Sequence, residues 1–113
     1  MDLPTLQARI REHLAGRHDV RVALLFGSRA RATARPDSDV DLAVEAPEVD
    51  LLTLGAELGA ALDLEVDVVE LADASIPLLE HVVRDGIVVH EGRRGAGGLW
   101  RSRTLATLET DRP

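Results

Sequence analysis

Apolar residues recur at helical spacing in several stretches of the chain. Leu6, Ile10 and Leu14 follow one another at intervals of four and would share one face of a helix. Pro4 suits the first turn of that helix, and Gly16 suits its end. Two later stretches have similar spacing. The predicted helices are residues 3–14, 51–62 and 76–83.

Short apolar runs between these helices predict β-strands. The first, VRVALLF, is almost entirely apolar and ends at Gly27, which is typical of a buried strand. The predicted strands are residues 20–26, 40–44, 64–71 and 87–89. Helices and strands in this order predict an α/β or α+β fold, in which a small mixed sheet has flanking helices and is covered mainly on one side.

The apolar pattern fades from Gly92 onward. The run RRGAGG that follows is basic and rich in glycine, which favours a flexible linker. We therefore expect one folded domain over residues 1–91 and a flexible C-terminal tail over residues 92–113. Trp100 in this tail has two interpretations: an anchor for a partner protein, or a tail residue without a role.

Composition narrows the classes of function. The chain has 113 residues and no cysteine, which excludes disulfides, thiolate zinc sites and cysteine nucleophiles. It contains no long apolar run and no basic-then-apolar leader, so we expect a soluble cytoplasmic protein without membrane contact. Its formal net charge of −7 disfavours long nucleic acid as a partner. A nucleotide bridged by metal cations remains compatible, since bound cations reverse the local sign.

Candidate chemistry is concentrated between the first two strands. Gly27 and Ser28 directly follow the first strand, and after ten intervening residues Asp39 and Asp41 open the second. A glycine lets backbone approach a phosphate closely, and serine adds a hydroxyl donor. If a helix begins here, the free N–H groups of its first turn also point toward that phosphate.

Three aspartates are candidate metal ligands and catalytic residues. Asp39 and Asp41 are two apart on a strand, so they share a face and could converge on hard cations. Asp67 lies in an otherwise apolar strand, where an unpaired charge is costly, and a laterally adjacent strand could bring it to the same ions as a general base. A chance Asp-x-Asp is expected in so acidic a chain; the upstream Gly-Ser makes the functional interpretation the stronger one.

Three arginines surround the proposed phosphate loop. Arg29, Arg31 and Arg35 could screen a triphosphate or its pyrophosphate leaving group. The alternative is that they pair with surface acids such as Asp37, because surface ion pairs are common and weak.

The run GSRARATARPDSDVDLAV resembles the signature of DNA polymerase β-type nucleotidyltransferases, in which Gly-Ser precedes Asp-x-Asp by ten residues. It is most similar to the minimal nucleotidyltransferase antitoxins encoded beside HEPN-domain toxins. The resemblance covers roughly residues 5–91, and its specific part is residues 25–45. It departs from the family at Ala32, where many relatives have glycine, and this bears on the geometry of the phosphate loop.

The resemblance implies a set of site residues. It implies a nucleotidyltransferase domain over residues 1–91 that binds Mg²⁺, with two ions expected, through Asp39, Asp41 and Asp67. It also implies that Gly27 and Ser28, with Arg29 beside them, hold the triphosphate of ATP. The family's Asp-x-Asp register falls on Asp39 and Asp41 rather than on Asp37 and Asp39.

The activity that the resemblance implies is transfer of AMP from ATP to a hydroxyl, expected to be a tyrosine, of a HEPN toxin encoded by a neighbouring gene. Such transfer silences the toxin's ribonuclease activity. Two alternatives stay open. One is transfer to a small molecule such as an aminoglycoside, which normally needs an added acceptor domain that this sequence lacks. The other is an antitoxin that neutralises the toxin by binding alone, with the catalytic residues idle.

Overall fold

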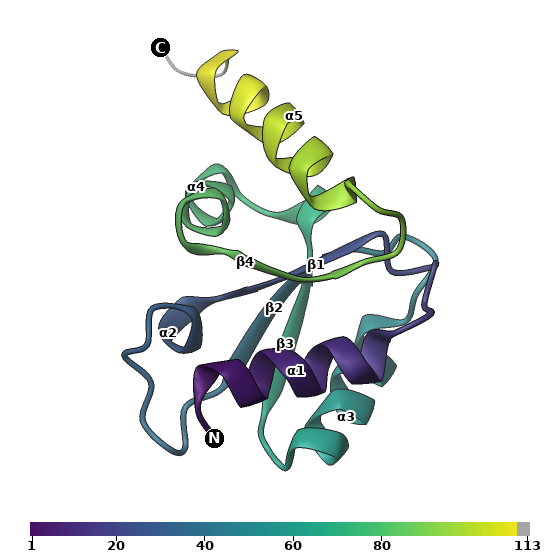
Figure 1. Cartoon of the computed structure of the whole chain (residues 1–113). Coiled ribbons are helices and arrows are strands. Elements are labelled where there is room, and N and C mark those ends of the chain that lie inside the picture. The colour runs from purple at the N-terminus through teal and green to yellow at the C-terminus, as the bar shows by residue number, and fades with distance from the viewer. Residues whose placement is uncertain (111–113) are drawn as a thin grey trace.

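Four strands form one mixed sheet through the middle of the molecule (Figure 1). The computed structural model describes residues 1–110. The strands are β1 (Val22–Phe26), β2 (Val40–Glu45), β3 (Val66–Glu70) and β4 (Ile87–Glu91), in the order β3-β2-β1-β4. β1 runs antiparallel to both of its neighbours, whereas β2 and β3 are parallel. The predicted small mixed sheet with flanking helices is therefore confirmed.

Helices α1 (Leu3–Leu14) and α3 (Leu51–Leu62) cover one face of the sheet. Each begins after an aspartate whose side chain accepts hydrogen bonds from backbone N–H groups of the first turn, Asp2 for α1 and Asp50 for α3. Their apolar stripes meet alternate residues of β1 and β2 in the larger part of the core. Its fully buried large side chains include Leu6, Ile10, Leu14, Leu25, Leu42, Leu54 and Leu58.

Helices α4 (Ile76–Asp85) and α5 (Ala96–Thr110) cover the opposite face, so the expectation of a sheet covered mainly on one side is wrong. The reason lies in β1. Val22 and Leu24 point to this face, whereas Ala23 and Leu25 point to the other, and all of them are fully buried. A strand that is apolar on both faces has to be covered on both.

The expectation of a flexible tail is also wrong over Ala96–Thr110, which forms α5. The side chain of Trp100 is only 4% exposed and completes the core on this face. The buried positions of α5 are Gly97, Trp100, Thr104 and Leu108, which recur at helical spacing. Because glycine and threonine occupy two of them, hydrophobicity alone does not reveal the buried stripe. The end of the expected tail, residues 111–113, lies outside the described residues.

The connection between β1 and β2 is mostly loop. Helix α2 (Gly27–Ala30) is a single turn. After β3 the chain makes a short 3-10 turn, η1 (Leu71–Asp73), before α4. No helix within residues 1–110 has the length and apolar character needed to cross a bilayer.

Candidate functional site

Asp41 and Asp67 lie side by side on neighbouring strands. The parallel pairing of β2 with β3 aligns these two residues directly. Aligned residues point to the same face of a sheet, and neighbouring strands are about 4.8 Å apart. Val40 and Leu42 point to the other face, into the core beneath α1 and α3. The structure thus brings Asp67 beside Asp41, as the sequence led us to expect.

The electrostatics of Asp41 show that the three carboxylates interact. Burial raises the pKa of Asp41, and the negative charges of Asp67 and Asp39 raise it further, while the charge of Arg31 opposes them. Asp39 is the last residue before β2, so it stands at the same end of the sheet. Like charges held together in this way favour the binding of a cation. Asp37, in the preceding loop, makes no contribution of this kind to Asp41.

The donor set suits a hard cation such as Mg²⁺, which prefers carboxylate oxygens and keeps positions for phosphate oxygens and water. Within residues 1–110, no three His, Asp or Glu side chains are gathered closely enough to hold a metal ion by themselves. Asp41 and Asp67 are aligned on neighbouring strands and Asp39 stands just before β2, so the three carboxylates form an open edge. Such an edge fits an ion that shares its coordination with a nucleotide.

Gly27 is fitted to this edge in two ways. Its φ of 75° lies in the left-handed region, which glycine adopts at little cost. A Cβ at this position would lie 3.2 Å from Cγ of Asp41 and would collide with the carboxylate oxygen Oδ2. Since Phe26 pairs with Asp41 across the two strands, the turn after β1 starts directly beside the carboxylate.

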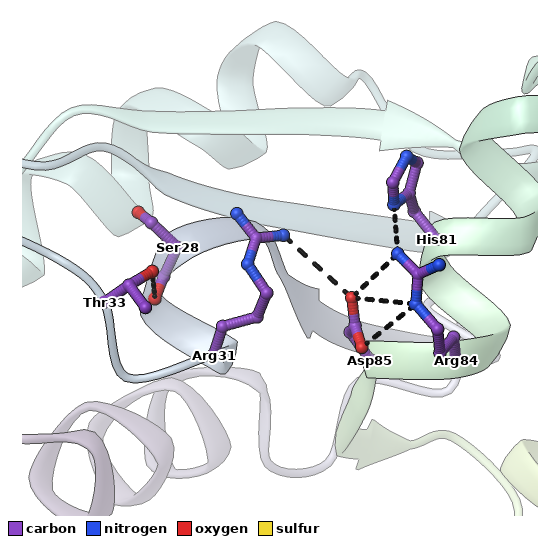
Figure 2. Close-up of polar contacts among 6 residues, drawn as sticks. All are labelled: Ser28, Arg31, Thr33, His81, Arg84 and Asp85. Atoms are coloured by element: carbon purple, nitrogen blue, oxygen red, sulfur yellow. Dashed lines mark hydrogen bonds and ion pairs between the residues drawn. The ribbon is translucent and has the colours of Figure 1, made fainter.

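Ser28 anchors the start of the loop through its backbone. Its carbonyl accepts hydrogen bonds from the backbone N–H of Thr33, at 3.0 Å, and from the Thr33 hydroxyl, at 3.4 Å. Figure 2 shows that the Ser28 hydroxyl points away from Thr33. The side chain is therefore not used to close this turn.

Arg29 is turned into the loop that connects α2 with β2. Its side chain is buried, with the residue only 6% exposed. Its Nη2 donates to the carbonyls of Ser38, at 2.8 Å, and Pro36, at 3.2 Å, and its Nε donates to Ser38 as well. The guanidinium thus holds the loop that leads to Asp39.

Arg31 is the arginine that faces the carboxylates. It is half-exposed, its charge lowers the pKa of Asp41, and its Nη1 lies 4.0 Å from Oδ2 of Asp85 at the end of α4 (Figure 2). Residues two apart in a helical turn are separated by about 200°, so Arg29 and Arg31 point in nearly opposite directions. The alternative interpretation, pairing with surface acids, holds for Arg31 through Asp85, whereas Asp37 itself forms no ion pair within residues 1–110.

A groove of about 700 Å³ opens beside the carboxylates. Asp41, Asp67 and Phe26 line it from the sheet, and Leu52 of α3 and Leu78 of α4 line its sides. It follows β3, which is an edge strand with one side unpaired. Leu52 is 88% exposed at this groove, which leaves an apolar surface next to the site.

The sequence model of the polymerase β nucleotidyltransferase family matches residues 8–94, a stretch that includes Gly27, Ser28 and all three aspartates. The chain belongs to this nucleotidyltransferase family. The match covers β1, β2 and β3 and so includes the whole carboxylate edge.

Individual relatives agree with this family. The chain is 37% identical over 71 residues to the protein adenylyltransferase MntA of Shewanella oneidensis, a match that covers 59% of this chain and 51% of the relative. The chain thus spans about half the length of this curated relative.

Two solved structures share the fold. A toxin–antitoxin crystal structure with AMP-PNP has a TM-score of 0.76 and 28% identity, over 92% of this chain and 87% of that one. A tri-AMPylated Shewanella oneidensis HEPN toxin in complex with its MNT antitoxin has a TM-score of 0.71 and 26% identity, over 96% of this chain and 87% of that one.

Proposed function

We propose that this nucleotidyltransferase transfers AMP from ATP to a hydroxyl side chain, most simply a tyrosine, of a HEPN-domain toxin, and so acts as its antitoxin. The observation that carries the proposal is the alignment of Asp41 with Asp67, with Gly27 directly against Asp41. A transfer site needs carboxylates for cations and a close approach for phosphate, and these residues supply both.

Asp39, Asp41 and Asp67 would hold Mg²⁺, which when bound neutralises the charge of the triphosphate and polarises its α-phosphate. Gly27 would admit the phosphates because it presents no side chain to them. Arg31, whose charge already acts on Asp41, would offset the charge of the departing pyrophosphate. Arg29 would position the loop before Asp39 without touching the nucleotide.

Asp67 would act as the general base. It is exposed, whereas Asp41 is half-buried, and it lines the groove, so an acceptor hydroxyl can reach it. The hydroxyl would give its proton to Asp67 while its oxygen bonds to the α-phosphorus of ATP. The bond from that phosphorus to the bridging oxygen breaks, and pyrophosphate leaves.

A protein acceptor is supported by the relatives. The curated relative is a protein adenylyltransferase, and one structural relative is an antitoxin in complex with an AMPylated HEPN toxin. The apolar rim at Leu52 suits a protein surface better than a polar antibiotic. Each AMP adds about one negative charge, which would repel RNA from a ribonuclease groove.

The test is intact-mass spectrometry of the HEPN-domain protein encoded beside this chain's gene, after incubation with the chain, ATP and Mg²⁺. We expect a gain of whole AMP units that is lost with Asp41→Asn. Asp37→Asn is the matched control, because it removes an exposed loop carboxylate of the same chemistry. Tight binding and full inhibition without any mass change would instead show neutralisation by binding alone. Modification of an aminoglycoside but not of the protein would show a small-molecule enzyme.

A further inference from the structure

Four arginines gather around a second groove, at the end of the sheet opposite to the carboxylates. The groove has a volume of about 970 Å³, and its lining includes Arg21, Arg93, Arg94 and Arg103. It also includes Glu45, which is four residues beyond Asp41 on β2 and hence about 13 Å along the strand. In Figure 1, α2 lies at one end of the strands and the connection from β4 to α5 lies at the other.

The charge of this groove contrasts with the rest of the chain. Four of the 13 basic residues line it, although the chain as a whole has a net charge of −7. Glu45 is the acidic residue of the lining, and Oε2 of its side chain lies 3.4 Å from Nη2 of Arg103. Arg21, Arg93 and Arg94 form no ion pair within residues 1–110. Three uncompensated cations therefore face this groove.

The loop that carries Arg93 and Arg94, between β4 and α5, is held by hydrogen bonds on both sides. The N–H of Gly92 donates to the carbonyl of Arg21 at 2.9 Å, and the ring of His18 hydrogen-bonds the Gly92 carbonyl at 2.9 Å. On the other side of the loop, the N–H of Gly97 donates to the side chain of Glu91 at 2.7 Å. The buried Trp100 then fixes α5 on the sheet. The arginines are thus presented by a folded element, which reduces the entropy lost on binding.

We propose that this groove binds an acidic segment of a partner protein. Guanidinium groups bind carboxylates with two parallel hydrogen bonds, which suits aspartate and glutamate side chains. Leu99 is 60% exposed in the same lining and offers an apolar contact beside the charged residues. Acidic and apolar residues together describe a protein segment.

A nucleic acid fits this groove less well. Single strands are bound by aromatic side chains on which bases stack. Within residues 1–110 the lining includes no Phe, Tyr or Trp, and its imidazole, His18, is engaged by the Gly92 carbonyl. A polyanion that extended beyond the arginines would also meet the field of a chain with a net charge of −7. The groove is therefore suited to a short anionic segment rather than to a long one.

The proposed segment would bind independently of nucleotide transfer, because the groove shares no residue with the carboxylate edge. The test is fluorescence anisotropy with a labelled Glu-Glu-Leu repeat peptide. A Gln-Gln-Leu repeat peptide serves as the neutral probe, and an oligothymidylate of equal charge serves as the nucleic-acid probe. We expect the acidic peptide to bind best and to weaken as salt is raised.

Charge reversal locates the binding. Arg94→Glu should weaken the acidic peptide about tenfold, and Arg93→Glu with Arg94→Glu should weaken it further. Arg9→Glu is the matched control, because Arg9 is an exposed arginine of α1 without an ion pair in residues 1–110, and its reversal changes the net charge equally. AMP-PNP affinity should stay unchanged in all of these variants, so that failure here is separable from failure of the transferase proposal.

Several results would overturn the inference. One is an equal loss of affinity for the acidic peptide in Arg94→Glu and Arg9→Glu, which would mean a general effect of net charge. Another is acidic-peptide binding no stronger than that of the neutral peptide. Preference for the oligothymidylate would assign the groove to nucleic acid. Self-association of the wild type that disappears in the Arg93→Glu, Arg94→Glu variant would assign it to a second copy of the chain.

Discussion

The backbone of Gly27 lies against the carboxylate of Asp41, so the turn after β1 and the charged edge of β2 form one unit. Two properties of glycine are used at this position. One is the left-handed φ of 75°, and the other is the absence of a Cβ where Asp41 stands. Gly16 shares the first property, with a φ of 80°, but a Cβ there would meet nothing within 4 Å. Comparison of the two glycines separates strain from collision.

Gly27→Ala should abolish AMP-PNP binding, because the new methyl group must displace the Asp41 carboxylate. Gly16→Ala should cost a similar backbone strain of about 1 kcal/mol while leaving nucleotide affinity unchanged. Isothermal calorimetry with Mg²⁺ and AMP-PNP measures the affinities, and urea melts measure the stabilities. Equal affinities in the two variants would mean that the turn at Gly27 has no role in the nucleotide site.

Asp41→Asn should stabilise the metal-free protein at neutral pH. The pKa of Asp41 is raised in the folded state by burial and by the charges of Asp67 and Asp39. The folded state therefore favours protonated Asp41, and the ionised group lowers the free energy of unfolding above its folded pKa. The variant removes this cost. Thermal melts in EDTA should show a higher Tm for Asp41→Asn than for the wild type.

The pH dependence of this difference checks its cause. As pH falls through the folded pKa toward the ordinary aspartate value of about 4, Asp41 becomes protonated and the wild type should gain stability relative to Asp41→Asn. The Tm difference should thus shrink at acidic pH. Asp37→Asn should show no such pattern, and a constant difference across pH would contradict an electrostatic origin.

The site could be predicted further than the fold around it. Gly27, Ser28, Asp39 and Asp41 are close in sequence, and strand periodicity indicated that Asp67 could lie beside them. The direction of a side chain within one helical turn was not predictable, so the sequence did not show that Arg29 binds the loop carbonyls while the charge of Arg31 acts on Asp41. That difference depends on where the turn begins, and α2 begins at Gly27 rather than later.

The C-terminal helix was missed for a different reason. Gly97 occupies a buried position, and a Cβ there would lie 2.9 Å from a methyl group of Val88. The helix therefore needs a residue without a side chain where it packs against β4. Arg101 donates from Nη2 to the carbonyl of Gly86 at 2.9 Å, which ties α5 to the turn after α4. Contacts of this kind form only in the folded protein. From the sequence alone, the glycine-rich run therefore indicated a linker.

Trp100→Ala should therefore destabilise the protein by about 3–5 kcal/mol, as expected when a large core side chain is removed. Leu105→Ala is the control on the same helix, because Leu105 is 44% exposed and its loss should cost less than about 1 kcal/mol. Chemical denaturation of both variants measures the difference. Equal stabilities would restore the interpretation of residues 92–113 as an independent tail.

Ala32→Gly should stabilise the protein by about 1 kcal/mol. Ala32 has a φ of 58°, a left-handed conformation that costs a residue with a Cβ roughly 1–2 kcal/mol. This is the position at which the resemblance to the family led us to expect glycine. Ala30→Gly is the opposite control, since Ala30 is helical and glycine there should destabilise by about 1 kcal/mol. Two changes of the same chemistry should thus shift the urea midpoint in opposite directions.

Arg29→Met should slow transfer although the Arg29 guanidinium is engaged by loop carbonyls. Removal of the guanidinium leaves the carbonyls of Pro36 and Ser38 without their donors, and these carbonyls belong to the loop that delivers Asp39. We expect a loss of about 2 kcal/mol in stability, because hydrogen bonds from a charged donor contribute about that much. Transfer should fall mainly through kcat, since Asp39 would be displaced while Gly27 still admits the phosphates.

Arg29→Lys separates positioning from stability. Lysine can restore the charge and one hydrogen bond but not the fork that serves two carbonyls, so it should recover much of the stability and only part of kcat. Arg31→Lys should behave in the opposite way, with little change in stability and a raised KM for ATP, because Arg31 is half-exposed beside Asp41. Steady-state kinetics with the toxin as acceptor would measure kcat and the KM for ATP, and urea melts would measure the stabilities. If Arg29→Met changed KM for ATP and left kcat intact, Arg29 would have to reach the nucleotide, and the assignment of the two arginines would be reversed.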